Sequence, residues 1–189
     1  PNGIIGEKDA CGVGFIANIK GVESNWILKQ SLKGLNCMEH RGGCGGDSDS
    51  GDGAGILCSI PWGYLEEKIN LKNTQEFNRG LGMVFMPNKK EKIEICKSIC
   101  DEEAEKLKVN KTSWRTVPVN NEILGPLAKA NAPFICQWIL YIDKKDHKDV
   151  ERLLFQLRKR IEKKIRETFK NDVGDCEFYF ASLSSQTVV

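Results

Sequence analysis

The stretch Asp9-Ala10-Cys11-Gly12-Val13-Gly14-Phe15-Ile16 places one thiol between a polar lead-in and an apolar run. The run over residues 13–19 predicts a buried strand. Two glycines leave room beside the thiol for a substrate or for another backbone. A cysteine held at the mouth of a strand is a candidate nucleophile. The same residues also fit a buried cysteine that packs as a small apolar side chain, as most free cysteines do.

Composition narrows the class of protein. The 189 residues are 40% hydrophobic and 29% charged, which is ordinary for a soluble globular chain with one domain or part of a larger protein. The net charge is +2, and Lys and Arg alternate with acidic residues, so neither a nucleic-acid partner nor a membrane partner is indicated. No apolar run approaches the length of a membrane span.

The cysteines and histidines indicate reduced thiols and no metal. Eight cysteines fall mainly within apolar helix or strand patterns, and Cys96 and Cys100 are one helical turn apart, where a disulfide would close almost no loop. This usage favours an intracellular setting. Only two histidines are present, His40 and His147, too few to complete paired clusters of zinc ligands.

Periodicity predicts a mixed α and β chain without internal repeats or linkers. Ser24 is a candidate N-cap, and Gly34 weakens the helix that follows but could let it pack closely. Residues 124–133 are expected to form a connector. The predicted helices cover 25–39, 61–69, 89–107 and 150–169, and the predicted strands cover 13–19, 56–60, 80–86, 114–119, 134–142, 177–183 and a start at 186–189.

Residues 39–55 form a glycine-rich stretch in which seven of 17 residues are glycine, which predicts a long shaped loop. A calcium loop starting at Asp47 would need Gly at Asp52 and Glu at Cys58, so that interpretation fails. A phosphate-binding loop would need Gly-Lys-Ser/Thr at its end, and this stretch contains no Lys, so that interpretation also fails. Two interpretations stay open: a plain connector, or a loop that presents His40 and Arg41 beside the nucleophile.

Several spaced motifs together resemble one family. The main motifs are Cys11-Gly-Val-Gly-Phe-Ile-Ala-Asn, Cys37-Met-Glu-His-Arg-Gly-Gly-Cys-Gly and Asp49-Ser-Gly-Asp-Gly-Ala-Gly. They resemble the amino-terminal glutaminase domain of glutamate synthases, closest to the ferredoxin-dependent type. Two later segments agree with the same domain, so the resemblance covers essentially the whole chain: Trp114-Arg-Thr-Val-Pro-Val and Ser182-Leu-Ser-Ser-Gln-Thr-Val-Val.

The resemblance implies a class II glutamine amidotransferase with an N-terminal nucleophile. The implied fold is α+β, a four-layer αββα sandwich that is incomplete at its C-terminal end. Cys11 corresponds to the nucleophile, residues 1–10 to the tail of a leader that is removed, and residues 11–189 to the front part of the domain. The α-amino group freed by cleavage, with a pKa near 8, would serve as the base. His40, Arg41 and Gly42 match a segment that supports the site, and no metal is expected.

The resemblance also implies partners outside this chain. In a full-length member, ammonia from glutamine reaches another domain, where 2-oxoglutarate, FMN and a 3Fe-4S iron–sulfur cluster complete glutamate synthesis. The electron donor would be ferredoxin or a nicotinamide cofactor, and the compartment cytoplasm or plastid. The residues for the glutamine carboxylate and the oxyanion hole are expected beyond Val189. An uncleaved or isolated chain is therefore expected to be inactive.

Two other functions are compatible with parts of the pattern. Another class II amidotransferase, making amino sugars or purine precursors, would share the cysteine but not the loop at 49–55 or the segment at 114–119. A non-catalytic α/β scaffold would have Cys11 buried in its core.

Overall fold

A computed structural model of the chain describes residues 12–38, 47, 49–51, 53–69, 77–143, 146–171 and 178–189. Contacts divide the chain into two compact units. Unit 1 comprises Pro1–Ile56 and Asn120–Asn131, and unit 2 comprises Leu57–Val119 and Ala132–Val189. Each unit is described by itself.

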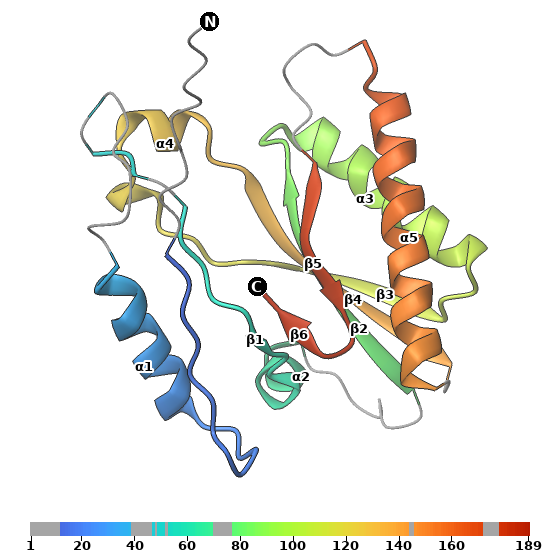
Figure 1. Cartoon of the computed structure of the whole chain (residues 1–189). Coiled ribbons are helices and arrows are strands. Elements are labelled where there is room, and N and C mark those ends of the chain that lie inside the picture. Colours follow the sequence, from blue (N-terminus) through green and yellow to red (C-terminus); the bar gives the residue numbers. More distant parts are fainter. Residues whose placement is uncertain are drawn as a thin grey trace, which may run out of the picture. The chain divides into compact units, whose positions relative to one another are not determined.

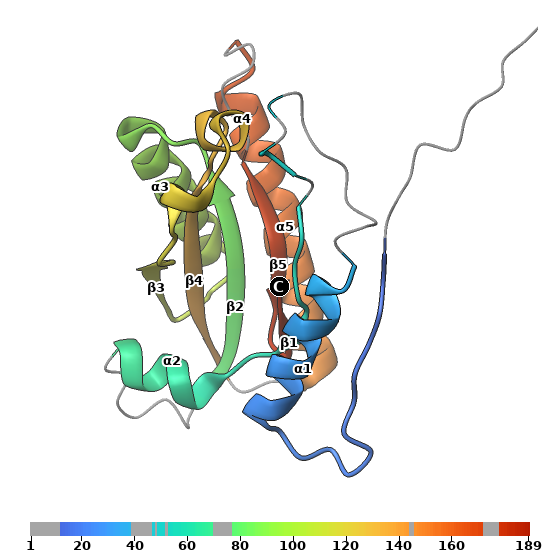
Figure 2. The same cartoon turned by 90° about the vertical axis from the view of Figure 1, so that its left-hand side faces the viewer.

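Unit 2 is built on a four-stranded antiparallel sheet with the order β3-β4-β2-β5, which Figure 2 shows strand by strand. Strands β2 and β4 pair along their whole lengths and form its centre. A register shift in the β2–β5 ladder places Phe180 and Leu183 on the same face of the sheet. The strands are β2 (Phe77–Met86), β3 (Lys111–Thr116), β4 (Phe134–Asp143) and β5 (Tyr179–Ser184).

One face of this sheet carries the larger core. Strand β4 alternates, so that Trp138 and Leu140 face this core while Ile139 faces the opposite side. Two helices, α3 (Lys90–Lys106) and α5 (His147–Thr168), lie side by side over the face (Figure 1). Gly80 permits this approach, because a Cβ built there would lie 3.0 Å from the side chain of Leu154 on α5.

The opposite face carries a smaller core and a second sheet. Strands β1 (Cys58–Ser59) and β6 (Thr187–Val188) pair antiparallel, and helix α2 (Trp62–Ile69) contributes the buried Leu65. Their apolar side chains pack against Leu81 and Ile139 of the main sheet. Unit 2 therefore contains a helix layer, a sheet and a second, smaller sheet.

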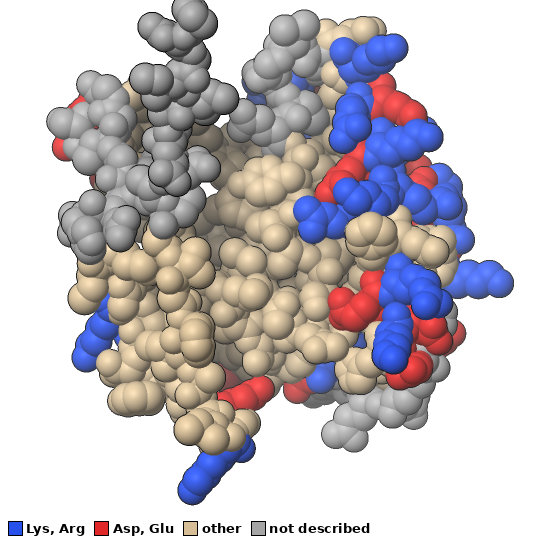
Figure 3. Space-filling model, in the orientation of Figure 1, with Lys and Arg blue, Asp and Glu red and all other residues tan. Residues whose placement is uncertain are grey.

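The outer surface of α5 is charged with both signs intermixed, as Figure 3 shows. Its buried side follows helical spacing, with Val150, Leu154, Leu157, Ile161 and Ile165 in the core.

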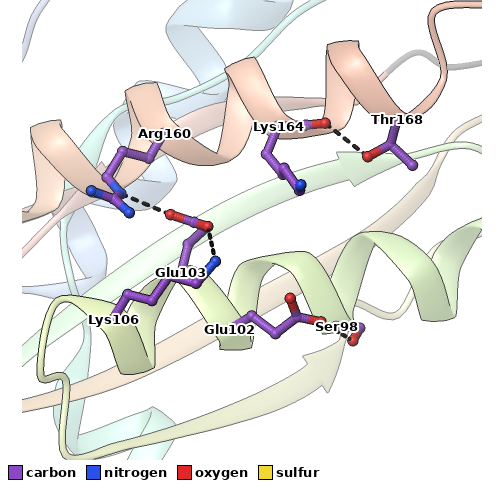
Figure 4. A network of polar contacts seen from close by, with 7 residues as sticks. All are labelled: Ser98, Glu102, Glu103, Lys106, Arg160, Lys164 and Thr168. Carbon is purple, nitrogen blue, oxygen red and sulfur yellow. Dashed lines mark hydrogen bonds and ion pairs between the residues drawn. The ribbon is translucent and has the colours of Figure 1, made fainter.

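Between the two helices, the carboxylate of Glu103 on α3 is buried and accepts hydrogen bonds from Arg160 of α5 at 2.7 Å and from Lys106 at 2.6 Å (Figure 4). The amphipathic helix predicted at 150–169 is confirmed and begins earlier, at His147.

Unit 1 contains three described helical segments. They are α1 (Asn25–Asn36), the 3₁₀ helix η2 (Asn121–Ile123) and α4 (Pro126–Ala130). The Ser24 hydroxyl accepts from the backbone N–H of Ile27, so the predicted N-cap is confirmed. Helix α1 buries no residue, and a Cβ at Gly34 would meet nothing within 4 Å, so the predicted close packing at Gly34 is wrong for the described chain.

The predicted strand at 13–19 is also wrong. No strand is assigned within residues 12–20, and Val13 and Phe15 are each 94% exposed. A strand requires a neighbour that completes its backbone hydrogen bonds, and the described residues supply none to this segment. Its apolar composition is therefore not matched by burial.

Most other element predictions are confirmed, with shifted boundaries. The helices expected at 61–69 and 89–107 correspond to α2 and α3, and the strands expected at 80–86, 114–119 and 134–142 to β2, β3 and β4. The strand expected at 56–60 shrinks to Cys58–Ser59, and the connector expected at 124–133 contains α4. Among the described residues, no helix is long and apolar enough to cross a membrane.

Candidate functional site

The four predicted site residues, Cys11, His40, Arg41 and Gly42, lie outside the described residues. The described chain flanks them closely in sequence. Residues 12–38 follow Cys11, and Asp47 follows the His-Arg-Gly segment. The structure therefore describes the frame from which the candidate site extends, in unit 1.

On the side of Cys11, the frame consists of an extended segment, a turn and α1. The turn is closed by a hydrogen bond from Gly21 N to Asn18 O at 2.9 Å, and Gly21 has a φ of +67°. That conformation favours glycine. Helix α1 then ends at Asn36, with Cys37 as its C-cap, just before the segment that contains His40.

On the C-terminal side of residues 39–46, the Asp47 carboxylate is held by three hydrogen bonds. Its Oδ1 accepts from Ser50 N at 2.9 Å, and its Oδ2 accepts from Ser50 Oγ at 2.7 Å and from Leu127 N at 2.9 Å. The Ser50 hydroxyl in turn accepts from Ala128 N at 3.0 Å. These donors keep the pKa of Asp47 at about 2, with the Leu127 N–H as the largest cause.

Asp47 and Ser50 together cap helix α4. The helix starts after Gly125, which has no side chain, and its first residue, Pro126, has no N–H. The next two N–H groups donate hydrogen bonds to this segment: Leu127 N donates to the Asp47 carboxylate, and Ala128 N donates to the Ser50 hydroxyl. The cap therefore comes from a segment roughly 80 residues earlier in the chain.

Gly125 makes this contact possible. A Cβ built there would lie 2.6 Å from Ser50 Oγ and 2.7 Å from both Asp49 C and Ser50 N. Two of these three atoms belong to the backbone, so a flexible side chain could not move aside to make room. The glycine is required by the close approach of the two segments.

Sequence reasoning missed this anchor. From the sequence, Asp47 is considered only as the first residue of a calcium-binding loop, and Gly125 is assigned to a connector. Both Asp47 oxygens are used to accept from N–H and O–H donors within unit 1. The spacing of Asp47 and Ser50 followed by a distant Gly-Pro pair was the only available signal.

Unit 2 contains a cleft whose described lining residues all belong to that unit. Helix α5 contributes His147 to it, and the Arg79 guanidinium lies 4.4 Å from the Trp62 ring centroid and pairs with Glu66. That arginine is thus already engaged. Among the described residues, no group of three or more His, Cys, Asp or Glu side chains could hold a metal ion. The cleft is lined by Trp62, Phe77, Asn78, Arg79, His147, Val150 and Ser185.

Comparison with known families assigns the chain. The family model for class-II glutamine amidotransferases matches residues 11–189, nearly the whole length. The chain belongs to the class II glutamine amidotransferase family. This membership confirms the predicted fold class, the α+β sandwich of the N-terminal-nucleophile hydrolases, of which unit 2 contributes a helix layer and two sheets.

Relatives of this amidotransferase chain are much longer proteins. The chain is 40% identical to ferredoxin-dependent glutamate synthase 1, chloroplastic/mitochondrial, of Arabidopsis thaliana over 98% of its own length and 12% of the relative. It is 41% identical to the chloroplastic ferredoxin-dependent glutamate synthase of Oryza sativa subsp. japonica over 100% of the chain and 12% of the relative. It is 40% identical to ferredoxin-dependent glutamate synthase 2 of a Synechocystis species, over 98% and 12%. The chain thus spans about 12% of the length of these curated relatives.

Proposed function

We propose that this chain is the glutaminase part of a glutamate synthase, with Cys11 as the nucleophile. The observation that carries the proposal is the family match, which begins at Cys11 and continues to residue 189. About 40% identity to ferredoxin-dependent glutamate synthases over nearly the whole chain supports the same assignment. The motifs that contain Cys11, His40 and Asp49 all lie inside the matched range.

The proposed reaction transfers the glutamine acyl group to sulfur and then to water. The thiol proton of Cys11 passes to the α-amino group of the same residue, and the thiolate adds to the side-chain amide carbon. The C–N bond breaks, and the proton returns to the departing nitrogen, so that ammonia leaves and a thioester remains. Water then attacks the thioester, the C–S bond breaks, and glutamate and the free thiol are released.

This scheme requires that the Ala10–Cys11 bond be cut. While the bond is intact, the nitrogen of Cys11 belongs to an amide and cannot accept the thiol proton. In the proposal, residues 1–10 are the tail of a leader, and His40, Arg41 and Gly42 lie beside the nucleophile and hold substrate. The start of the family match at residue 11 supports this division.

The rest of the reaction belongs to other parts of the longer protein. Ammonia would reach 2-oxoglutarate in a domain that carries FMN and a 3Fe-4S cluster, and the names of the relatives favour ferredoxin over a nicotinamide cofactor as the electron donor. The word chloroplastic in two of these names supports a plastid location, and the cytoplasm stays the alternative.

The test uses the complete natural protein that contains this chain and its Cys11→Ala variant. We expect mass spectrometry to find Cys11 as the first residue of the mature protein, and diazo-oxo-norleucine to label it. Glutamine-dependent glutamate synthesis should disappear in the variant while synthesis from added ammonia persists. Glutamine consumption at the normal rate in Cys11→Ala would contradict the proposal. Glutaminase activity without transfer to 2-oxoglutarate would identify another class II amidotransferase, and an uncut, unlabelled protein would indicate a scaffold.

A further inference from the structure

We propose that a second copy of this chain docks on the helix layer of unit 2, with α3 of each copy packed against α5 of the other. The two helices lie side by side on one face of the main sheet, and the charges on the outside of each are sorted by face. The inference concerns assembly of the protein and does not depend on the proposed function.

The outermost residues of α5 form a basic ridge. They recur at spacings of three and four residues, so they share one face of the helix, and this face is opposite to the buried side. All of them are exposed, and Phe155, at 61% exposure, lies near the middle. The ridge is about 27 Å long, because an α-helix rises about 1.5 Å per residue. The basic ridge consists of Lys148, Arg152, Phe155, Lys159, Lys163 and Arg166.

The outermost residues of α3 form an acidic ridge. They too lie opposite to the buried side of their helix, and all are exposed. Ile95, at 42% exposure, is the apolar member of this ridge. Each ridge therefore carries charge of a single sign together with one exposed apolar side chain. The acidic ridge consists of Glu91, Glu94, Ile95, Ser98, Glu102 and Glu105.

The charged groups of the two ridges are weakly engaged within one copy. The Lys163–Glu167 and Glu94–Lys97 pairs are long, at 3.9 Å and 3.8 Å between nitrogen and oxygen. Ion pairs of this kind at a protein surface contribute little to stability. Arg166 makes no ion pair within the part of the chain that the structure describes. A partner can therefore recruit these groups without breaking a strong internal interaction.

The two ridges cannot meet within one molecule, because both point away from the sheet that the helices cover. Inside one copy, α3 and α5 contact each other through their flanks, where Arg160 donates to Glu103 at 2.7 Å (Figure 4). A twofold rotation places the acidic ridge of each copy opposite the basic ridge of the other. Such self-complementarity is what a closed, symmetric dimer requires.

The acidic ridge argues against the other partners that a basic helix could attract. Anionic membranes and nucleic acids present broad negative surfaces, and an acidic protein does the same. Any of these would be attracted by α5 and repelled by the glutamates of the neighbouring α3. A second copy is different, because it presents positive charge to α3 and negative charge to α5.

The size of the contact predicts a weak dimer. Helices of 17 and 22 residues are about 26 Å and 33 Å long, and each presents a face about 10 Å wide. Both faces in both copies amount to about 1,200 Å², which is at the lower limit of specific interfaces. Because the contact is also highly charged, we expect its dissociation constant to depend on salt.

The experiment measures self-association of the complete natural protein by sedimentation velocity. The basic-ridge variant combines Lys159→Glu with Lys163→Glu, and the acidic-ridge variant combines Glu102→Lys with Glu105→Lys. Each variant alone places like charges opposite each other, so its dimer should be weakened roughly tenfold or more. In an equimolar mixture, opposite charges face each other again in the mixed dimer. We expect the mixture to associate within about threefold of wild type, which misfolded variants could not do.

The control variant combines Lys111→Glu with Lys164→Glu, which changes the net charge as much as the basic-ridge variant does. Both residues are exposed and lie off the ridges, and Lys164 is the sequence neighbour of Lys163. Its association should stay within about threefold of wild type. Raising NaCl from about 50 to about 500 mM should weaken the wild-type dimer roughly tenfold.

Three results would overturn the inference. One is a wild-type protein that remains monomeric at about 50 μM in low salt, since such a dimer would be too weak to be specific. Another is equal weakening in the control and basic-ridge variants, or no weakening in either ridge variant. The third is a mixture of the two ridge variants that stays monomeric. Salt-sensitive binding of the monomer to phosphatidylglycerol vesicles or to duplex DNA would identify a different occupant and would also overturn it.

Discussion

The indole rings of Trp114 and Trp138 stack with their centroids 5.3 Å apart and donate both N–H groups to one carboxylate, that of Asp101. The two tryptophans are direct partners in the β3–β4 ladder, whereas Asp101 belongs to α3. Thr112 adds a third donor at 2.7 Å. A single acidic residue on the helix therefore satisfies three polar groups on the sheet and fixes how α3 lies on it.

Asp101→Ala should destabilise unit 2 by about 2–4 kcal/mol, because it leaves indole N–H groups without an acceptor where Trp138 is completely buried. Chemical denaturation followed by tryptophan fluorescence measures the change. Glu102→Gln is the matched control, since among the described residues the Glu102 carboxylate accepts a hydrogen bond only from the exposed Ser98. A loss below about 0.5 kcal/mol in Asp101→Ala would show that the bonds are individually dispensable.

Glu103 should make stability depend on pH. Its pKa lies below the ordinary value, first because Lys106 donates to it and then because Arg160 does. A lowered pKa contributes stability that is present in full above the unfolded-state value of about 4.3 and is lost as the pH falls through the folded value. Glu103→Gln should cost about 1–2 kcal/mol at pH 7 and nothing at pH values below the folded pKa.

The control for Glu103 is Glu167→Gln, which removes an exposed pair with Lys163 at 3.9 Å on the same helix layer. Surface pairs of this kind contribute little. Denaturant unfolding of both variants at several pH values from 3 to 7 decides the matter. If the difference in the free energy of unfolding between wild type and Glu103→Gln stays constant across that pH range, the ion pair does not stabilise the packing of α3 against α5.

Two glycine substitutions should have opposite effects in unit 1. Gly125→Ala places a Cβ against the backbone of Asp49 and Ser50, which separates α4 from its cap. Loss of a cap costs about 1 kcal/mol, so amide exchange in 120–131 should accelerate about fivefold or more. Gly34→Ala meets no neighbouring atom and lies inside α1, so exchange there should slow. Equal effects of the two variants would contradict the close approach at Gly125.

The rates at which the buried thiols of unit 2 are alkylated should show whether its core opens. Burial raises the pKa of Cys100 well above its ordinary value, and burial likewise raises the pKa of Cys136, whereas Cys37 in unit 1 is exposed. With iodoacetamide at pH 8, Cys37 should react before Cys96, Cys100 and Cys136, and those three buried thiols should react only at the rate of unfolding. Rapid labelling of Cys100 in the folded protein would show that the core between α3 and the sheet opens locally.

Local signals predicted the elements of unit 2 well. Pro61 precedes α2, Pro87 follows β2, and the apolar spacing after Val150 continues to the end of α5. In each case the residues that set the boundary lie within the element or beside it. Strands β2 and β4, which pair antiparallel over ten residues, each contain an apolar run that can be recognised in the sequence.

Unit 1 was predicted less well, for physical reasons. The apolar run at 13–19 gives no information on whether a neighbouring strand exists to pair with it. Helix α4 has only five residues, too few for a periodic pattern, and its cap is contributed by Asp47. The assignment of Cys11 and His40 came from motifs whose meaning depends on resemblance, whereas the cap of α4 depends on a contact between residues 80 positions apart in the chain.

During protein synthesis, the two halves of the α4 cap are made at different times. Leu127 is translated 80 residues after Asp47, and ribosomes add about 5–20 residues per second, so the acceptor exists for roughly 4–16 s before its donor is made. During that interval the N–H groups of Leu127 and Ala128 do not yet exist, so Asp47 and Ser50 have no partner in α4. The order of emergence from the ribosome therefore delays formation of this cap until the central part of the chain has been made.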